Sequence, residues 1–354
     1  MVQNTNIYSD QKVRYGTGLR YKISDEINLL GCRKALVLST PEQSQVALDI
    51  ASGLGDYVAG IYSKAAMHTP MDVTDDALID LEKSGADCLI AVGGGSTTGL
   101  GKALSMRTGL PQIVVPTTYA GSEATPILGQ TENGIKTTFS DPRILPKIVL
   151  YDPELVVSLP TELTVTSALN AMAHAIEALY AKDRTDKTTE LAVSGLKSFQ
   201  SALPLVLEDP RNLSAREETL RGAWACGTVL GLVGMALHHK LCHTLGGSFN
   251  LPHAQTHAII LPHATAFNAK AAHNNLHPIT EIFGGTQPGQ ALWDFAKKLG
   301  APLSLQKLGL RETDLDKAAE IATQNPYWNP RPIDQQGVRA LLENAWSGSP
   351  PSQI

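Results

Sequence analysis

Cys88-Leu-Ile-Ala-Val-Gly-Gly-Gly-Ser-Thr97 is the most informative stretch for the architecture, because an apolar run passes directly into three glycines. A strand that is apolar along its whole length is typical of a parallel sheet whose two faces are covered by helices. Helical spacing resumes near Lys102, so the glycines mark a turn from a strand into a helix. Four further apolar runs alternate with helical patterns in this half of the chain: 35–39, 58–62, 112–116 and 148–151. We therefore expect an α/β N-terminal domain with a parallel, Rossmann-like sheet.

The glycines also form a candidate phosphate-binding turn. Glycines between a strand and a helix let backbone N–H groups approach phosphate oxygens, and the following helix N-terminus favours negative charge. The spacing matches neither G-x-G-x-x-G nor a Walker A loop, and a tight turn that needs positive φ is the structural alternative. Three consecutive glycines followed by Ser and Thr favour phosphate binding over that alternative. The candidate cofactor-binding residues in this turn are Gly93, Gly94, Gly95, Ser96 and Thr97.

A second polar loop, Pro116-Thr-Thr-Tyr-Ala-Gly-Ser-Glu123, follows the next expected strand. Ligands of open α/β sheets bind outside the carboxyl ends of the strands, so two such loops predict one bound dinucleotide, with Thr117 and Thr118 as contacts. The first apolar run ends in Ser39 and Thr40, where a carboxylate would bind the adenosine ribose and repel a 2′-phosphate. Because both side chains are neutral, we include them among the cofactor contacts and expect that either NADH or NADPH is accepted.

The sequence pattern changes after Leu159-Pro160, where helical spacing replaces the strands. We assign residues 1–157 to an NAD(P)-binding domain and 158–354 to an all-helical domain. Ser214-Ala-Arg-Glu217 predicts a capping box at the start of a long helix. The apolar run 224–237 predicts a buried helix that is too short to span a bilayer. The other expected helices span 164–181, 237–245, 256–269, 288–299 and 312–324.

Composition restricts the class of partner. Among 354 residues there are 29 Lys and Arg against 34 Asp and Glu, a formal net charge of −5. This balance argues against nucleic acid or an anionic membrane as a partner. The N-terminus is polar without a signal-peptide pattern, and the four cysteines show no paired spacing. We therefore expect a cytoplasmic protein with free thiols.

A group of histidines with one amide forms the candidate active site. Asn170-Ala-Met-Ala-His174 places an amide and an imidazole at i and i+4, on one face of a helix. His239 and His243 stand in the same relation in a second helical pattern, and His253 follows in a loop. Several imidazoles can hold a divalent transition metal, or they can bind a carboxylate, stabilise an oxyanion and donate a proton.

Two details of this group matter for its chemistry. A metal set of this kind usually includes a charged oxygen ligand, whereas Asn170 is neutral. Lys240 lies beside the face that carries His239 and His243, and adds a cation that suits an anionic substrate. The other histidines of this region are expected to be structural or exposed, and they are His238, His257 and His263.

In their order along the chain, these segments resemble the iron-containing alcohol dehydrogenase superfamily (group III), which has the dehydroquinate-synthase-like fold. The resemblance rests on the glycine turn at 93–102, the Pro-Thr-Thr loop at 116–123, the helix at 170–177 and the His-x-x-x-His…Pro-His segment at 239–253. It implies that metal-dependent members carry ligands at the positions of Asn170, His174, His239 and His253, with Asp at the first. It also implies a homodimer.

Three segments resemble one branch of that superfamily, the maleylacetate reductases: 116–123, 129–136 and Asn325-Pro-Tyr-Trp-Asn-Pro-Arg-Pro332. The resemblance to this branch implies NAD(P)H-dependent reduction of the C=C bond of maleylacetate to 3-oxoadipate, in the degradation of aromatic compounds. It implies a dianionic oxo-acid substrate and no requirement for a metal. Hydride addition to the carbon β to the ketone builds an enolate, which is more stable than an alkoxide, so a Lewis acid is less necessary.

The resemblance also suggests a role for each site residue. His243 is expected nearest the nicotinamide and substrate, and His243 or His253 is expected to donate the proton or stabilise the oxyanion. The residues expected to bind the substrate are Lys240, His174, His239, Asn170 and, through a hydrogen bond, Tyr119. We expect Glu177 to be structural, and Arg331 to be either structural or functional.

Three rival functions remain at this point. The first is a metal-dependent alcohol dehydrogenase of the same superfamily in which Asn170 is an unusual ligand. The second is a lyase that resembles dehydroquinate synthase and also needs a metal. The third is a non-catalytic nucleotide sensor, which the His and Lys group disfavours because binding NAD alone does not require that group.

Overall fold

The computed structural model describes residues 10–132 and 135–352 of the chain. The polar N-terminal segment and the centre of the 129–136 motif, Asn133 and Gly134, lie outside the described residues. The chain divides between Leu159 and Pro160 into two compact units, an α/β unit and a helical unit. Each unit is described here by itself.

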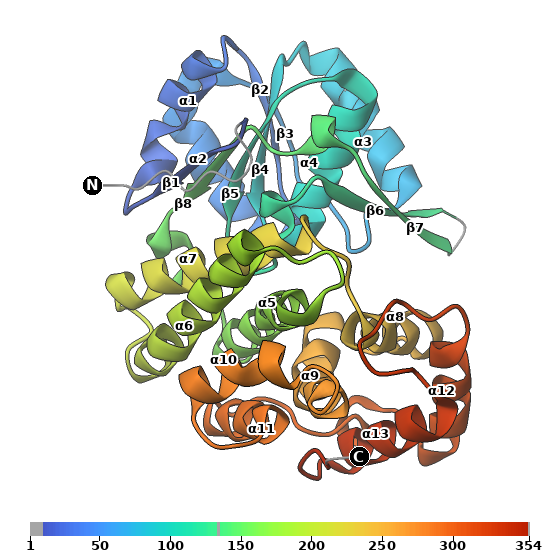
Figure 1. The fold of residues 1–354 in the computed structure, drawn as a ribbon. Coiled ribbons are helices and arrows are strands. Elements are labelled where there is room, and N and C mark those ends of the chain that lie inside the picture. Colours follow the sequence, from blue (N-terminus) through green and yellow to red (C-terminus); the bar gives the residue numbers. More distant parts are fainter. Residues whose placement is uncertain (1–9, 133–134, 353–354) are drawn as a thin grey trace. The chain divides into compact units, whose positions relative to one another are not determined.

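The α/β unit is built on a six-stranded sheet, in the order β1-β8-β5-β4-β2-β3, in which all neighbouring strands are parallel (Figure 1). Its strands are β1 (Lys12–Tyr15), β2 (Ala35–Leu38), β3 (Val58–Tyr62), β4 (Cys88–Gly93), β5 (Gln112–Pro116) and β8 (Ile148–Tyr151). The five apolar runs of the sequence are all strands of this sheet, so the predicted parallel sheet is confirmed. β1 was not predicted, because it alternates exposed and half-buried residues at the edge of the sheet.

Helices cover both faces of this sheet. The helices of the unit are α1 (Ile23–Leu29), α2 (Ser44–Leu54), α3 (Met71–Ser84) and α4 (Gly95–Thr108). Within β2, Val37 packs in one apolar cluster with residues of α1 and α2, whereas Leu36 and Leu38 pack in the other with residues of α3 and α4. Successive strand side chains point to opposite faces, and both faces here bury apolar side chains, mainly Ile and Val on the first and Leu on the second. Each such side chain contributes about 1.5–3 kcal/mol when fully buried.

A separate hairpin lies outside the six-stranded sheet. β6 (Ile127–Glu132) and β7 (Ile135–Ser140) pair antiparallel with each other. Gly, Gln and Thr fill much of β6, so its sequence lacks the apolar signal of the sheet strands. The hairpin was therefore not predicted.

The helical unit carries no strand within residues 160–352, so the expected all-helical second half is confirmed. Its helices are α5 (Thr161–Tyr180), α6 (Asp186–Glu208), α7 (Leu213–Leu230), α8 (Leu237–Phe249), α9 (His253–Asn268), α10 (His273–Phe283), α11 (Pro288–Lys298), α12 (Leu315–Thr323) and α13 (Gln335–Ser347). An apolar core joins α8, α9, α12 and α13 and includes Leu237, Leu241 and Leu245.

Two helix predictions in this unit are wrong. The N-cap of α7 is Asn212, whose side chain accepts a hydrogen bond from the backbone N–H of Ala215 at 3.0 Å, so the capping box at 214–217 does not form. The run 224–237 is not one helix, because α7 ends at Leu230 and a bend precedes α8. The carboxylate of Asp183 accepts the backbone N–H of Gly234 in this bend, which favours the break.

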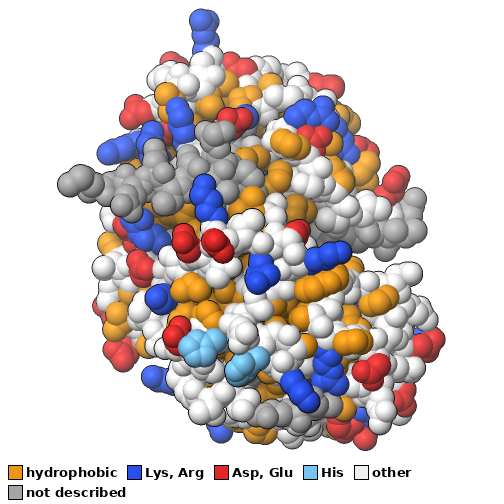
Figure 2. Space-filling model, in the orientation of Figure 1, with side chains coloured by type: hydrophobic (Ala, Val, Ile, Leu, Met, Phe, Trp, Pro, Cys, Tyr) orange, Lys and Arg blue, Asp and Glu red, His pale blue; other side chains and the backbone are white. Residues whose placement is uncertain are grey.

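The cysteines, the helix lengths and the surface charge complete the description of the fold. All four cysteines are buried free thiols. Within the described residues, no helix combines the length and apolarity that crossing a membrane requires. Figure 2 shows acidic and basic side chains interspersed over the face in view.

Candidate active site

The glycine turn connects β4 to α4 and leaves the start of that helix open. Gly93 has a φ of 151°, and a Cβ on it would lie 2.5 Å from Oγ1 of Thr97, so only glycine fits there. The N-cap, Gly94, supplies no side chain to cap the helix. The first N–H groups of α4 therefore lack a side-chain acceptor, which is the arrangement that binds anions at helix N-termini.

The second loop lies directly beside this turn. β4 and β5 are neighbours with Gly93 opposite Pro116, and a Cβ on Gly94 would lie 2.8 Å from Oγ1 of Thr118. The hydroxyl oxygens of Thr97 and Thr117 are buried and have no hydrogen-bond partner. Buried polar atoms are normally paired. The turn and the loop thus present backbone N–H groups and two unpartnered hydroxyls together, a donor set that suits a pyrophosphate.

Lys102 holds these two segments together and is not a candidate ligand contact. Its ammonium group is fully buried and donates to the carbonyl oxygens of Ser122 and Ile127 at 2.6 and 2.8 Å, and to Oγ1 of Thr125 at 3.1 Å. Burial lowers the pKa of Lys102 to about 7, and the nearby Glu123 carboxylate opposes that shift. The lysine therefore fastens α4 to the loop after β5.

Ser39 and Thr40 differ in their surroundings. Ser39 is buried, and its hydroxyl donates to the Ser63 hydroxyl at 2.9 Å, so this side chain already has a partner inside the protein. Thr40 is half-buried at the N-terminus of a short 3₁₀ helix (Pro41–Gln43). Of the two, Thr40 is the better placed to meet a ligand.

Six histidines of the helical unit form one contacting cluster. The ring of His174 on α5 stacks against that of His239 on α8 with centroids 5.2 Å apart, and His239 lies 6.1 Å from His243. His257 on α9 lies 5.2 Å from His239 and 4.3 Å from His253. His253 is the first residue of α9 and not part of the preceding loop. The structure thus brings the predicted histidines of three helices together.

Glu177 on α5 holds part of this cluster in place through hydrogen bonds to α8. Its fully buried carboxylate accepts hydrogen bonds of 2.7 Å from the backbone N–H groups of Ala236 and His238 and from Nδ1 of His239. The two backbone contacts cap the N-terminus of α8, where a negative charge is favourable. A carboxylate only accepts here, so Nδ1 of His239 carries a proton and the ring is fixed in one orientation. The structural role expected for Glu177 thus includes orienting a site residue.

Several buried polar atoms of the cluster lack a hydrogen-bond partner. They are Oδ1 of Asn170, Nδ1 of His174, Nε2 of His239, Nδ1 of His238 and Nε2 of His257. Leaving such an atom unpaired costs about 1–3 kcal/mol. Burial lowers the pKa of His174 well below its ordinary value, and the neighbouring histidines lower it further. His174 is therefore neutral near pH 7 and offers a hydrogen bond without a positive charge.

A second part of the site is more open. The exposed ring of His243 places Nδ1 3.1 Å from the hydroxyl of Tyr327, and the ammonium of Lys240 lies 5.9 Å from the centre of the Tyr327 ring. Burial raises the pKa of Tyr327, and Glu177 adds to this shift, so the hydroxyl stays protonated. A Tyr327 hydroxyl that donates to Nδ1 leaves the proton of a neutral His243 on Nε2. No role for Tyr327 was predicted from the sequence.

The iron that the superfamily pattern implies does not fit this donor set. Within residues 10–132 and 135–352, the groups of three His, Cys, Asp or Glu with ligand atoms all within 4.8 Å of one another are His238–Cys242–His257 and Cys32–Asp87–Cys88. The family positions at 174, 239 and 253 are in neither group, and position 170 offers a neutral amide. Divalent iron prefers a set that includes charged oxygen.

The structure also places the other residues singled out in the sequence. Tyr119 is fully buried in the α/β unit. His238 and His257, expected to be structural or exposed, are buried members of the cluster, whereas His263 is buried elsewhere on α9. Arg331 stacks its guanidinium 3.9 Å from the centre of the Phe267 ring, which indicates a structural role. The i, i+4 spacing of His253 and His257 was the sequence signal that could have placed His257 in the cluster.

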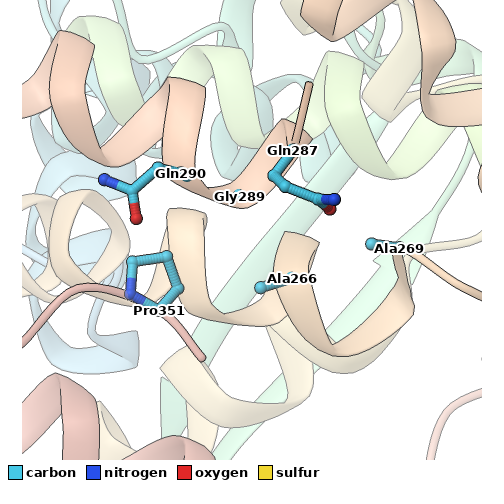
Figure 3. Close-up of a pocket in the computed structure, with 6 residues that line it drawn as sticks. All are labelled: Ala266, Ala269, Gln287, Gly289, Gln290 and Pro351. Atoms are coloured by element: carbon cyan, nitrogen blue, oxygen red, sulfur yellow. The ribbon is translucent and has the colours of Figure 1, made fainter. Parts of the chain in front are cut away.

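A small pocket lies elsewhere in the helical unit. Figure 3 shows Gln287, Gly289 and Gln290 on one side, with Ala266 and Pro351 among the other lining residues. None of the residues that line it belongs to the histidine cluster. It contributes nothing to the candidate site.

Comparison with known proteins covers both units. The family described as iron-containing alcohol dehydrogenase matches residues 10–153, and the Fe-containing alcohol dehydrogenase family, C-terminal, matches residues 164–346. Maleylacetate reductases of Rhizobium sp. and Sphingobium indicum are 55% and 49% identical over 340 residues, which is 96% of this chain and 97% and 96% of theirs. A crystal structure of maleylacetate reductase from Agrobacterium tumefaciens is 54% identical with a TM-score of 0.95, and the match covers 99% of this chain and all of that one.

Proposed function

This chain belongs to the iron-containing alcohol dehydrogenase family, and from that premise we propose that it is an NAD(P)H-dependent maleylacetate reductase. The observation that carries the proposal is the 55% identity to a maleylacetate reductase over 96% of the chain. The reaction reduces the C=C bond of maleylacetate and gives 3-oxoadipate, a step in the degradation of aromatic compounds. The histidine cluster supports it, because an enolate and two carboxylates need hydrogen-bond donors and cations.

The chemistry assigns a task to each part of the cluster. Charge that develops on the ketone oxygen of the substrate is stabilised by N–H groups already aimed at it, and one such donor contributes about 3–4 kcal/mol. We assign this task and proton donation to His243 and His253. Lys240 supplies a positive charge for a carboxylate. The neutral His174, Asn170 and His239 hold the substrate through hydrogen bonds, and Tyr119 remains a further candidate.

The α/β unit supplies the cofactor contacts in this proposal. NADH or NADPH, when bound, supplies the hydride. The uncapped N-terminus of α4 and the unpartnered hydroxyls of Thr97 and Thr117 suit its pyrophosphate. Gly93 to Ser96 and Thr118 complete this donor set, and the neutral Thr40 does not repel a 2′-phosphate. Either cofactor is therefore accepted.

One assay tests the proposed function. The purified chain is incubated with maleylacetate and either NADH or NADPH, with and without a metal chelator, and cofactor oxidation is followed by absorbance. We expect turnover with both cofactors and no loss with the chelator. Stoichiometric metal whose removal abolishes turnover would favour a metal-dependent alcohol dehydrogenase. A preference for NADH of more than about a thousandfold, or roughly 4 kcal/mol, contradicts dual cofactor use.

The same proposal predicts the result of replacing Thr97 by valine. Valine keeps the shape and removes a buried hydroxyl that has no partner in the protein, so stability is unchanged or slightly higher. The KM for NADH should rise about tenfold to a hundredfold, since a hydrogen bond to a charged phosphate is lost. Ser105→Ala is the matched control, because the Ser105 hydroxyl is also buried and unpartnered on α4. Equal effects of the two variants on the KM for NADH would remove Thr97 from the cofactor site.

We infer that the chain is a homodimer, which the family resemblance implies, and that it works in the cytoplasm, which its four free thiols favour. Sedimentation of the purified protein at several concentrations checks the first, and fractionation of cells checks the second.

A further inference from the structure

His257 lies at the centre of the histidine cluster, although the proposed reaction gives it no task. It is 1% exposed and contacts the rings of His238, His239 and His253. An ordinary core position would take an apolar residue, because burying an imidazole without partners is unfavourable. A structural histidine would also be expected to pair both of its ring nitrogens.

Only one of its two ring nitrogens is paired. Nδ1 of His257 lies 2.9 Å from Nε2 of His238, whereas Nε2 of His257 is buried without a partner. His239 is built in the same way, since its Nδ1 is held at 2.7 Å by Glu177 and its Nε2 is unpartnered. Two neighbouring imidazoles thus have a fixed Nδ1 and an unpartnered Nε2. Pairing of this kind fixes the orientation of a ring so that its other nitrogen can meet a ligand.

The anchor of His257 is itself held in place. The backbone N–H of His238 donates to Glu177 at 2.7 Å, so the carboxylate that orients His239 also fixes the residue that orients His257. His238 and Cys242 lie one helical turn apart on α8, with the thiol sulfur 3.6 Å from Nε2 of His238. Both side-chain contacts of His238 reach its Nε2, so the backbone of this residue is held by Glu177 and its Nε2 lies between His257 and Cys242.

We propose that His257 is a further substrate-binding residue, which donates a hydrogen bond from Nε2 to a carboxylate oxygen of the dianionic substrate, with His238 as its positioning residue. This inference rests on the proposed function. We assign the tautomer in which Nε2–H of His238 donates to Nδ1 of His257, which places the proton of His257 on Nε2. A carboxylate is the ligand that satisfies this buried donor, and a hydrogen bond to a charged acceptor is stronger than one to a neutral acceptor.

An unpartnered ring nitrogen does not by itself indicate a binding role, and the contact between His257 and His238 is the second observation. His263, on the same helix, is buried with both ring nitrogens unpartnered. Within residues 10–132 and 135–352, however, no ring contact joins it to the cluster. His263 is therefore the matched control, since it is also a buried histidine on α9 but makes no ring contact with the described residues of the cluster.

The test compares His257→Ala with His263→Ala in the full chain. Binding of 3-oxoadipate, the product dianion, is measured by calorimetry, and the KM values for maleylacetate and NADH are measured separately. His257→Ala should weaken 3-oxoadipate binding and raise the KM for maleylacetate about tenfold to a hundredfold, with the KM for NADH nearly unchanged. His263→Ala should lower the unfolding temperature and leave both KM values as they are.

Two further measurements separate a binding role from a structural one. His238→Leu should raise the KM for maleylacetate. His238→Gln should keep this KM close to that of the parent, because the glutamine amide still donates to Nδ1 of His257. In the parent protein, the ¹⁵N resonance of His257 Nε2 should shift when 3-oxoadipate is added, and this holds even if the alanine variant fails to fold.

The outcomes distinguish this inference from the proposed function. A parent protein that neither binds 3-oxoadipate nor reduces maleylacetate overturns both. This inference alone is overturned if the parent protein binds 3-oxoadipate and reduces maleylacetate, but the His257 resonance does not shift with the ligand. It is also overturned if His257→Ala changes 3-oxoadipate binding and the KM for maleylacetate by less than about fivefold.

Discussion

Replacing His243 by alanine is expected to lower kcat for maleylacetate reduction by about a hundredfold to a thousandfold, with little change in the unfolding temperature. The kinetic effect follows from the loss of a donor that stabilises the charge on the ketone oxygen in the transition state. The small effect on stability follows from the position of the ring, which is exposed on α8. Steady-state kinetics and a thermal melt of the same sample measure the two quantities.

Two companion variants make this prediction specific. His277→Ala removes another exposed histidine of the helical unit, one on α10 that lies 3.5 Å from Glu281, and should leave kcat unchanged. Tyr327→Phe removes the hydroxyl that pairs with Nδ1 of His243 and keeps the ring under Lys240, so it should lower kcat less than His243→Ala. A His243→Ala enzyme that raises KM and keeps its kcat would mean that His243 binds substrate without assisting the chemical step.

The parallel sheet was predictable because its strands are apolar on both faces. β4 runs Cys-Leu-Ile-Ala-Val-Gly with every residue buried, and such runs stand out in a sequence. β1 and β6 did not stand out, because edge strands and hairpins are partly exposed and carry Lys, Arg, Gln or Thr. The pairing of β1 also depends on β8, a strand distant in the chain, which local composition does not encode.

The break between α7 and α8 shows the same limit. The run 224–237 has the apolarity of one helix, yet Glu177 from α5 accepts the N–H groups of Ala236 and His238 and starts a new helix there. The boundary is set by a residue 59 positions away in the chain. A sequence pattern within the run could not reveal it.

The candidate site was predictable in part, because spacing along a helix reveals some of its residues and the others depend on the fold. His174, His239, His243 and His253 were found by spacing, and the structure brings their rings into one cluster. His257 was missed because the expected helix began at 256, whereas α9 begins at His253 and puts these two residues one turn apart. Tyr327 was missed because only the fold brings it to His243.

Glu177 is expected to couple stability and activity more strongly than any other single residue of the site. Its carboxylate accepts from two backbone N–H groups and from His239, and a glutamine has one oxygen to offer in place of two. In either amide orientation an NH₂ group faces at least one N–H donor of α8. We expect Glu177→Gln to lower the free energy of unfolding by about 2–4 kcal/mol, because buried donors are left unpaired.

The effect of Glu177→Gln on catalysis should exceed what lost stability alone explains. The NH₂ orientation that faces His239 permits that ring to take the other tautomer, and His238, the anchor of His257, loses part of its restraint. We expect kcat/KM for maleylacetate to fall about a hundredfold at a temperature where the variant remains fully folded. Glu162→Gln, an exposed carboxylate on the same helix α5, should change neither quantity. If Glu177→Gln is destabilised but keeps the kcat/KM of the parent, then Glu177 caps α8 without orienting the histidines, and the site must be held by contacts other than this carboxylate.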